Sequence, residues 1–218
     1  MKTLAITAAK GGVGKSTLSV HLATLASSHG WDVLIADLDP QRSAGDWRDV
    51  RDADTPLVAP VDPASLDALV EAARGEGIDL LVIDTPPHAE KSILPAAMLA
   101  DLALVPTRPA PFDLRAIGRT LDMLATGGVT YSVVLNATPP KLGSAERGIV
   151  REARAALAGH PVCPVSIAQR VSLSHALISG GAVHEYEPRG KAARELGALW
   201  KWAAAELDMP TQPERATT

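Results

Sequence analysis

The stretch LAITAAKGGVGKSTLSVHLATLAS, residues 4–27, decides the fold of this chain. Its first four residues form a short apolar run typical of a buried strand, and its last ten place apolar side chains at helical spacing. Between them, Gly11, Gly12 and Gly14 let the backbone bend closely without a Cβ in the way. A helix N-terminus behind such a turn offers unpaired N–H groups and the positive end of a dipole. The stretch therefore predicts a strand, a phosphate-binding loop and a helix.

The residues that follow these glycines fit a nucleoside triphosphate with magnesium. Lys15 is placed to reach the β- and γ-phosphates, and the Ser16 hydroxyl is placed to ligate Mg²⁺. Thr17, one residue further along, stands at the position for the α-phosphate. A glycine-rich turn that merely precedes a helix is the alternative, but this loop also follows the first strand and precedes acidic motifs. We therefore predict ATP and Mg²⁺ as cofactors.

The composition of the 218 residues indicates one large α/β domain, because 46% are hydrophobic and 21% are charged. We expect a single domain over residues 1–208 and a flexible tail over residues 209–218. No apolar run reaches the roughly 18 residues of a membrane span, and the chain opens on a strand rather than a signal peptide. We therefore expect a cytoplasmic protein without a membrane partner. The one cysteine, Cys163, is expected to be a buried structural thiol.

Short runs rich in Val, Ile and Leu alternate with helical patterns, as they do in βαβ units. The strands that we expect are 2–7, 32–37, 57–59, 80–84, 102–106, 130–136 and 162–165. The helices that we expect are 15–28, 63–74, 91–100, 113–125, 144–158, 173–179 and 190–207. This order predicts a mostly parallel, twisted sheet with helices on both faces, the fold of P-loop nucleotide-binding proteins.

Polar residues end three of these strands, at the sheet edge where open α/β sheets bind ligands. Asp37 and Asp39 lie in VLIADLDPQ, Asp84 ends the apolar run of LLVIDTPP, and Asn136 ends that of SVVLNATPP. A carboxylate beside the phosphate loop suits Mg²⁺, because this ion prefers oxygen ligands. Helix capping is the alternative for Asp37 and Asp39, and a turn residue is the alternative for Asn136.

One departure from the usual nucleotide loop points to a particular family. The standard pattern G-x-x-x-x-G-K-[ST] has glycine where this chain has Ala9, and this chain carries a second lysine, Lys10, in KGGVGKS. The loop resembles the deviant Walker A motif of the ParA/MinD superfamily. In that superfamily the early lysine crosses to the nucleotide of the partner subunit, so the resemblance implies an ATP-dependent homodimer. From the residues alone, Lys10 could equally be a solvated loop lysine.

The resemblance also implies roles for the polar strand ends. The DxDPQ-like segment implies that Asp39 orients the attacking water and that Asp37 supports magnesium and the loop geometry. LLVIDTPP resembles a Walker B segment, in which Asp84 is the magnesium residue, and Asn136 matches the family asparagine that contacts adenine. The loop 164–168 is expected to close over the adenine ring. The nucleotide contacts that the resemblance implies are Lys10, Gly11, Gly12, Val13, Gly14, Lys15, Ser16, Thr17, Asn136, Pro164 and Ser166. The catalytic residues that it implies are Lys10, Lys15, Asp37 and Asp39. The metal residues that it implies are Ser16, Asp37 and Asp84.

The late segment IAQRVSLSHALISGGAVHEYEPRGKAARELGALW, residues 167–200, looks like the end of small partition ATPases and extends the resemblance over nearly the whole chain. We expect no operator-specific regulator, because no helix-turn-helix precedes the loop. A MinD-like membrane cycle is not expected either, since MPTQPERATT is no basic amphipathic helix. A single cysteine also argues against the iron–sulfur relatives, whose clusters need several thiolates.

The distribution of charge leaves room for a DNA surface. Residues 1–140 carry a net charge of −6, whereas residues 141–201 carry +4. The small members of the superfamily bind DNA without sequence preference as ATP dimers and release it after a partner stimulates hydrolysis. Candidate contacts are Arg147, Arg151 and Arg154, at helical spacing, and a shorter stripe of Arg115 and Arg119. Each of these arginines could also be an ordinary solvated residue.

The resemblance implies a ParA-type ATPase with slow, partner-stimulated hydrolysis. Such a protein positions or segregates a plasmid, a chromosome locus or a protein cluster with a ParB-like partner, and it associates with the nucleoid when ATP is bound. Two alternatives stay open. One is an ATP-dependent enzyme for a small substrate on the same fold, similar to dethiobiotin synthetase, and the other is a VirC-type scaffold of conjugation systems.

Overall fold

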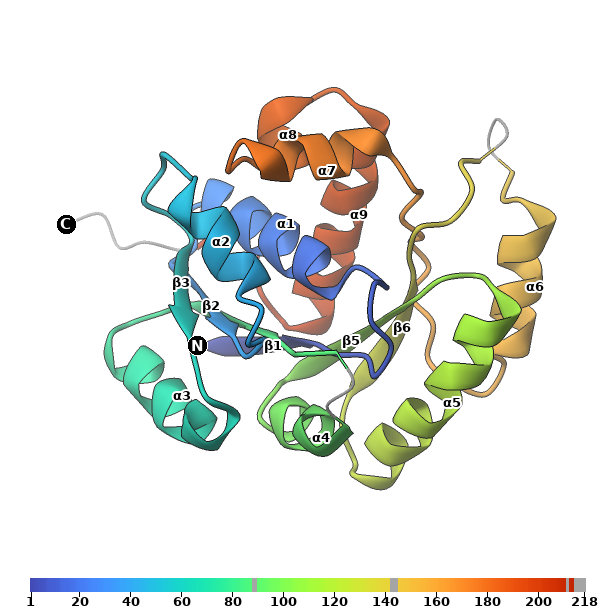
Figure 1. Cartoon of the computed structure of the whole chain (residues 1–218), viewed down its shortest axis with the longest axis horizontal. Helices are drawn as coiled ribbons and strands as arrows, with labels where there is room; N and C mark the ends of the chain where they lie inside the picture. The colour runs from blue at the N-terminus through green and yellow to red at the C-terminus, as the bar shows by residue number, and fades with distance from the viewer. Residues whose placement is uncertain (88–89, 142–144, 211, 214–218) are drawn as a thin grey trace.

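A six-stranded parallel sheet forms the centre of the molecule (Figure 1), seen in a computed structural model that describes residues 1–87, 90–141, 145–210 and 212–213. The strand order is β3-β2-β4-β1-β5-β6. The strands are β1 (Lys2–Ile6), β2 (Val33–Asp37), β3 (Leu57–Pro60), β4 (Leu80–Asp84), β5 (Leu102–Thr107) and β6 (Tyr131–Leu135). The four strands β2, β4, β5 and β6 are buried along their whole length, which explains their predominantly apolar sequences.

Helices cover both faces of the sheet, as the sequence predicts (Figure 1). Helices α1, α2, α7, α8 and α9 lie on one face, and α3, α4, α5 and α6 lie on the other. Their bounds are α1 (Lys15–Ser28), α2 (Ser43–Asp49), α3 (Leu66–Gly75), α4 (Glu90–Met98), α5 (Pro111–Thr126), α6 (Gly148–Ala156), α7 (Val171–Ile178), α8 (Val183–Tyr186) and α9 (Lys191–Glu206), with a 3₁₀ turn at Pro63–Ser65. Each face has its own apolar core, one centred on α1 and α9 and the other on α3, α4 and α5.

The register of the central strands assembles the predicted site. Strand β4 pairs with β1 and β2 so that Asp84 lies opposite both Ile6 and Asp37. The loop that leaves β1 therefore begins beside two carboxylates that are far apart in the sequence. Because all strands run in parallel, their carboxyl ends meet at this one edge.

The structure corrects several expected elements. Residues 162–165 are not a strand, because Pro161 and Pro164 interrupt the run and only an isolated bridge joins Val162 to Val133. The short helices α2 and α8 were not predicted, since neither has enough turns for a periodic pattern. The helix expected at 144–158 covers only Gly148–Ala156. Part of that expected range, like most of the tail at 209–218, lies outside the described residues.

The apolar core continues beyond the expected end of the domain. Met209 is buried in the cluster around α1 and α9, and its backbone N–H donates to the Ala204 carbonyl. Met209 therefore packs with the domain rather than belonging to the expected tail. Across the described part of the chain, no helix is long and apolar enough to cross a membrane.

Candidate nucleotide-binding site

The phosphate loop joins β1 to α1 through two left-handed glycines. Gly12 has φ +70° and Gly14 has φ +94°, a conformation that side-chain-bearing residues rarely adopt. Lys15, the first residue of α1, is 6% exposed, and its ammonium donates to the Lys10 carbonyl across 3.5 Å. Burial lowers the pKa of Lys15, whereas the negative charges of Asp84 and Asp39 raise it. The loop thus surrounds a lysine whose ammonium makes one long hydrogen bond to the loop backbone.

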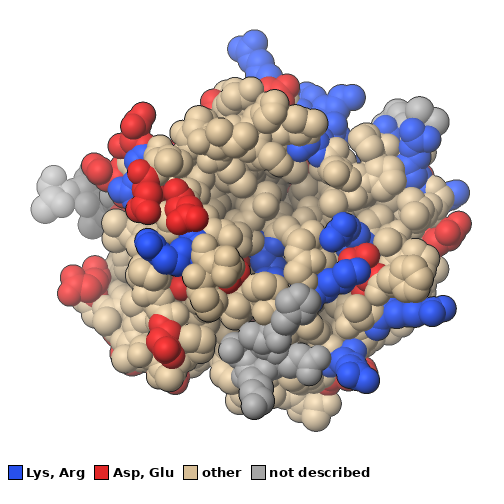
Figure 2. Space-filling view, in the orientation of Figure 1, with Lys and Arg blue, Asp and Glu red and all other residues tan. Residues whose placement is uncertain are grey.

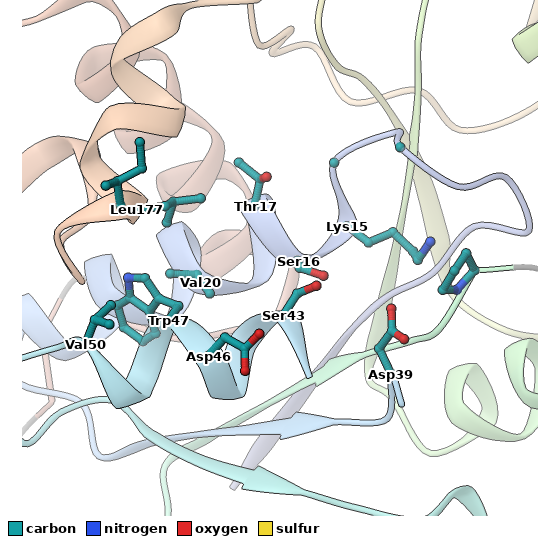
Figure 3. A pocket seen from close by; sticks show the side chains of 14 residues that line it. Lys15, Ser16, Thr17, Val20, Asp39, Ser43, Asp46, Trp47, Val50 and Leu177 are labelled. Carbon is teal, nitrogen blue, oxygen red and sulfur yellow. The ribbon is translucent and has the colours of Figure 1, made fainter. Parts of the chain in front are cut away.

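A cavity of about 530 Å³ opens in front of this loop. Figure 3 shows Lys15 and Asp39 toward one end of the cavity and Trp47, Val50 and Leu177 toward the other. The lining residues are Gly12, Gly14, Lys15, Ser16, Thr17, Val20, Asp39, Ser43, Asp46, Trp47, Val50, Pro87, Leu177 and Ile178. Gly12, Gly14 and the run Lys15–Thr17 of the predicted loop therefore share one cavity with Asp39, whereas Lys10, Gly11 and Val13 do not line it.

Asp84 has the features of a magnesium residue. It is fully buried at the end of β4, and neither carboxylate oxygen has a hydrogen-bond partner of good geometry among the described residues. Burial raises the pKa of Asp84 to about 7, and Asp37 adds to this effect, whereas Ser16, Ser19 and Lys15 oppose it. A divalent cation held by Ser16 and Asp84, directly or through water, would compensate the buried carboxylate, so these residues fit Mg²⁺.

Asp37 and Asp39 serve different purposes in the structure. The buried Asp37 carboxylate accepts three backbone N–H bonds, each 3.0 Å long, from Asp39, Ala44 and Gly45. It therefore shapes the loop after β2, as expected, and it also caps the N-terminus of α2, which is the alternative role given above for this residue. Asp39 accepts one bond of 2.9 Å from the Gln41 N–H and faces the cavity. Of these two aspartates, Asp39 is the one that lines the cavity.

Asn136 lies against the phosphate loop rather than in the open cavity. Its side-chain amide donates to the Val13 carbonyl at 2.7 Å, and only 7% of the residue is exposed. The segment with Pro164 and Ser166 runs beside the end of β6, where the Ile167 N–H donates to the Leu135 carbonyl. Neither Asn136 nor this segment lines the 530 Å³ cavity. Their contacts with adenine stay a prediction.

Lys10 points to a different set of groups. It does not line the cavity, and its ammonium lies 2.9 Å from the Asp113 carboxylate at the start of α5. The Arg108 guanidinium lies 3.7 Å from the same Asp113 oxygen. Lys10 and Lys15 therefore leave the same loop in different directions.

Comparison with known proteins shows to which family this nucleotide-binding domain belongs. A family model described as "CobQ/CobB/MinD/ParA nucleotide binding domain" matches residues 4–183, which include the phosphate loop and all three strand-end motifs.

The chain belongs to the CobQ/CobB/MinD/ParA family.

Relatives of this ParA-type ATPase include two proteins named "Maintenance of carboxysome distribution protein A". That of Gloeobacter kilaueensis is 33% identical over 214 residues, covering 95% of this chain and 94% of the relative. That of Halothiobacillus neapolitanus is 29% identical over 205 residues, covering 88% and 91%. The "Chromosome-partitioning ATPase Soj" of Thermus thermophilus is 32% identical over 153 residues, covering 57% and 61%.

Solved structures show the same fold. A Cyanothece McdA variant in complex with ATP superposes with a TM-score of 0.71 at 19% identity, covering 99% of each chain. MinD in the MinC:MinD complex of Aquifex aeolicus superposes with a TM-score of 0.74, also at 19% identity and 99% coverage of each chain. These structures confirm the parallel α/β fold, while the family match confirms the ParA/MinD resemblance drawn from the loop.

The arginine stripe on α6 needs a correction. Arg147 precedes the helix as its N-cap residue, and Arg154 turns toward the protein, where it pairs with Glu146 at 3.2 Å and donates to the Cys163 and Pro164 carbonyls. Arg151 is exposed, as is Arg147. The helical spacing of the three arginines therefore does not expose them equally to solvent. Arg115 and Arg119 on α5 are both exposed.

Sequence reasoning missed two groups at this site, the Arg108–Asp113 pair and the α2 side of the cavity. Arg108 directly follows β5, which neighbours β1, so its place at the carboxyl edge was a usable signal. The α2 residues Asp46 and Trp47 gave no such signal. They reach the cavity because the Trp47 indole N–H donates to the Gly181 carbonyl, between α7 and α8, at 3.0 Å.

Proposed function

We propose that this ParA-type ATPase forms an ATP-dependent homodimer that binds DNA without sequence preference and positions a cargo with an activating partner protein. The position of Lys10 carries the proposal. Its side chain is 39% exposed and turned away from the cavity of its own subunit, so it serves no phosphate there. A second copy facing the loop would bring this cation to the other nucleotide.

Within one subunit, the residues divide the work of hydrolysis. The loop amides and Lys15 hold the β- and γ-phosphates, while Ser16 and Asp84 hold the cation. Magnesium neutralises charge on the phosphate oxygens when it is bound. Asp39, which lines the cavity, would then orient a water molecule with its carboxylate. Positioning of this kind lowers the barrier without tightening substrate binding.

The relatives support a positioning role for the hydrolysis cycle. Two of them are named for carboxysome distribution, and one is named for chromosome partitioning. The cargo is accordingly a large assembly or a DNA locus, and the partner is a ParB-like protein or a functional equivalent. Hydrolysis would be slow alone and faster with that partner.

The charge pattern supports DNA as the surface to which the ATP-bound protein attaches while it positions its cargo. Figure 2 shows most Lys and Arg of the viewed face on the side of α5 and α6, and most Asp and Glu on the side of α2 and α3. Arg115, Arg119, Arg147 and Arg151 are the exposed candidates on the basic side. A dimer would double their number, which favours phosphate contacts and nucleoid association in the ATP state.

Sedimentation with a non-hydrolysable ATP analogue tests the proposal. The wild type should dimerise with the analogue and stay monomeric with ADP. Lys15→Gln should lose nucleotide binding, whereas Lys10→Ala should bind nucleotide as a monomer and fail to dimerise. Lys201→Gln, an exposed lysine on α9, is the matched control and should behave as wild type. A dimer of normal strength in Lys10→Ala would contradict the proposal, and hydrolysis that required a small substrate instead would favour the synthetase-like alternative.

A further inference from the structure

Three charged side chains form a cluster beside the phosphate loop, outside the nucleotide cavity. Asp113 lies in the first turn of α5, and its carboxylate is only 8% exposed. Lys10 lies 2.9 Å from its Oδ1 atom and Arg108 lies 3.7 Å from the same atom. Two cations from separate segments thus share one nearly buried carboxylate.

Arg108 is placed against the loop itself. A Cβ built on Gly12 would lie 3.3 Å from Arg108 Nη2, so the guanidinium packs close to the loop backbone. Its Nε is buried and has no hydrogen-bond partner of good geometry among the described residues. Arg108 therefore has an unused N–H donor close to Asp113.

The departure of Lys10 from Asp113 has an energetic consequence. A nearly buried carboxylate that loses the closer of its two cations is destabilised, because solvent cannot replace the lost charge and Arg108, at 3.7 Å, makes no hydrogen bond of good geometry with any described residue through its Nε. Lys10 would thus be retained by its own subunit unless another cation replaced it. Arg108 already lies within a short side-chain movement of the carboxylate, and its planar fork suits two parallel N–H bonds.

We propose that Arg108 is a positioning residue that takes over Asp113 when Lys10 leaves for the partner subunit's nucleotide. This inference rests on the proposed function of Lys10. The exchange keeps the carboxylate paired throughout, so the dimer forms without a stranded charge. Arg108 acts here through Asp113 and Lys10 and touches no phosphate itself.

The exchange makes Arg108 important only while Asp113 is charged. Arg108→Gln should leave monomer nucleotide affinity unchanged but raise the protein concentration needed for half-maximal dimerisation by about tenfold. Arg108→Lys, which keeps the charge, should restore most of the loss. In an Asp113→Asn background no carboxylate holds Lys10, so adding Arg108→Gln should change nothing.

Sedimentation equilibrium with the non-hydrolysable ATP analogue measures each of these constants. Arg194→Gln, at an exposed arginine on α9 far from the phosphate loop in sequence, is the control and should dimerise as wild type. An Arg108→Gln variant that dimerises normally would overturn the inference. The inference would also be overturned if Arg108→Gln weakened dimerisation equally in the wild-type and the Asp113→Asn backgrounds, because Arg108 would then bind the nucleotide or the other subunit directly. A wild type that never dimerises would instead refute the proposed function, which separates the two failures.

Discussion

The side-chain amide of Asn136 donates a hydrogen bond of 2.7 Å to the backbone carbonyl of Val13. This bond joins the end of β6 to the phosphate loop across 123 residues of sequence. It approaches the loop so closely that a Cβ on Gly14 would collide with the Asn136 amide. Gly14 thus meets two requirements at once, a left-handed backbone with φ +94° and space for a neighbouring strand.

Gly14→Ala should therefore weaken ATP binding and lower the thermal stability of the protein. The new methyl group meets both a strained backbone conformation and the Asn136 side chain, which together cost about 1–3 kcal/mol. Gly118→Ala on α5 is the matched control, since nothing lies within 4 Å of its Cβ position. That change should leave ATP binding intact and raise stability by up to ~1 kcal/mol. Titration with a fluorescent ATP analogue and thermal unfolding measure the two effects, and equal behaviour of the two variants would contradict this account of Gly14.

Asp39→Ala should bind ATP and Mg²⁺ normally but hydrolyse ATP at least about 100-fold more slowly, because it removes the group that orients water. The ATP-bound dimer should accumulate as a result. Asp46→Ala, which removes another carboxylate lining the same cavity, should keep its hydrolysis rate. Phosphate release and light scattering with ATP measure rate and assembly. A wild-type rate in Asp39→Ala would assign water positioning to another residue.

His21 should make the protein less stable as the pH falls below about 6.5. It is fully buried on α1, and burial, together with the neighbouring His184, lowers its pKa to about 3, although Glu185 opposes this. The unfolded chain therefore binds a proton in this range that the folded chain does not. The contribution approaches about 1.4 kcal/mol of unfolding free energy per pH unit.

Urea unfolding between pH 5 and pH 7 measures this slope. His21→Gln should flatten the pH dependence of the unfolding free energy, whatever its effect on absolute stability. His175→Gln changes an exposed histidine on α7 and should leave the slope as it is. An unchanged slope in His21→Gln would mean that its ring is protonated in the folded protein.

Arg147→Glu combined with Arg151→Glu should weaken DNA binding in the ATP state and spare ATP hydrolysis without DNA. Each lost phosphate contact should reduce the dependence of log affinity on log salt by roughly one. Arg74→Glu on α3, on the opposite side of the molecule from α6 in Figure 1, is a charge-reversal control at a distant position and should keep DNA binding. A shift assay at two salt concentrations, with ADP and with a slowly hydrolysed ATP analogue, measures the effect. If the ATP-bound wild type did not bind DNA at low salt, the proposal that it positions its cargo on DNA would be contradicted.

Arg154 should be treated separately from these two arginines. Its guanidinium is bound to Glu146 and to two backbone carbonyls, so Arg154→Glu would place two carboxylates together and release both carbonyls. A loss of DNA binding in that variant would report local unfolding. Helical spacing in the sequence shows which residues share a face, but it does not show which of them a neighbouring loop engages.

The sequence by itself determined the family, the parallel sheet and the chemistry of the loop, because these depend on local patterns. Three glycines, Lys15 and a strand-helix context fit few structures besides a phosphate loop, and Lys10 distinguishes this family from others. Buried parallel strands are also recognisable as apolar runs, and all six observed strands end within one residue of the carboxyl end that the sequence predicts.

Only the tertiary structure decided which groups meet across long separations. The Asn136 bond to Val13, the Trp47 bond that brings α2 to the cavity, and the pairing of Asp113 with both Lys10 and Arg108 all join residues from different segments. Such contacts depend on strand order and on how loops cross the carboxyl edge of the sheet, and no local periodicity encodes either. For the same reason Asp37 and Asp39, two residues apart in one motif, could be separated into a helix cap and a cavity-facing carboxylate only when the position of α2 was known.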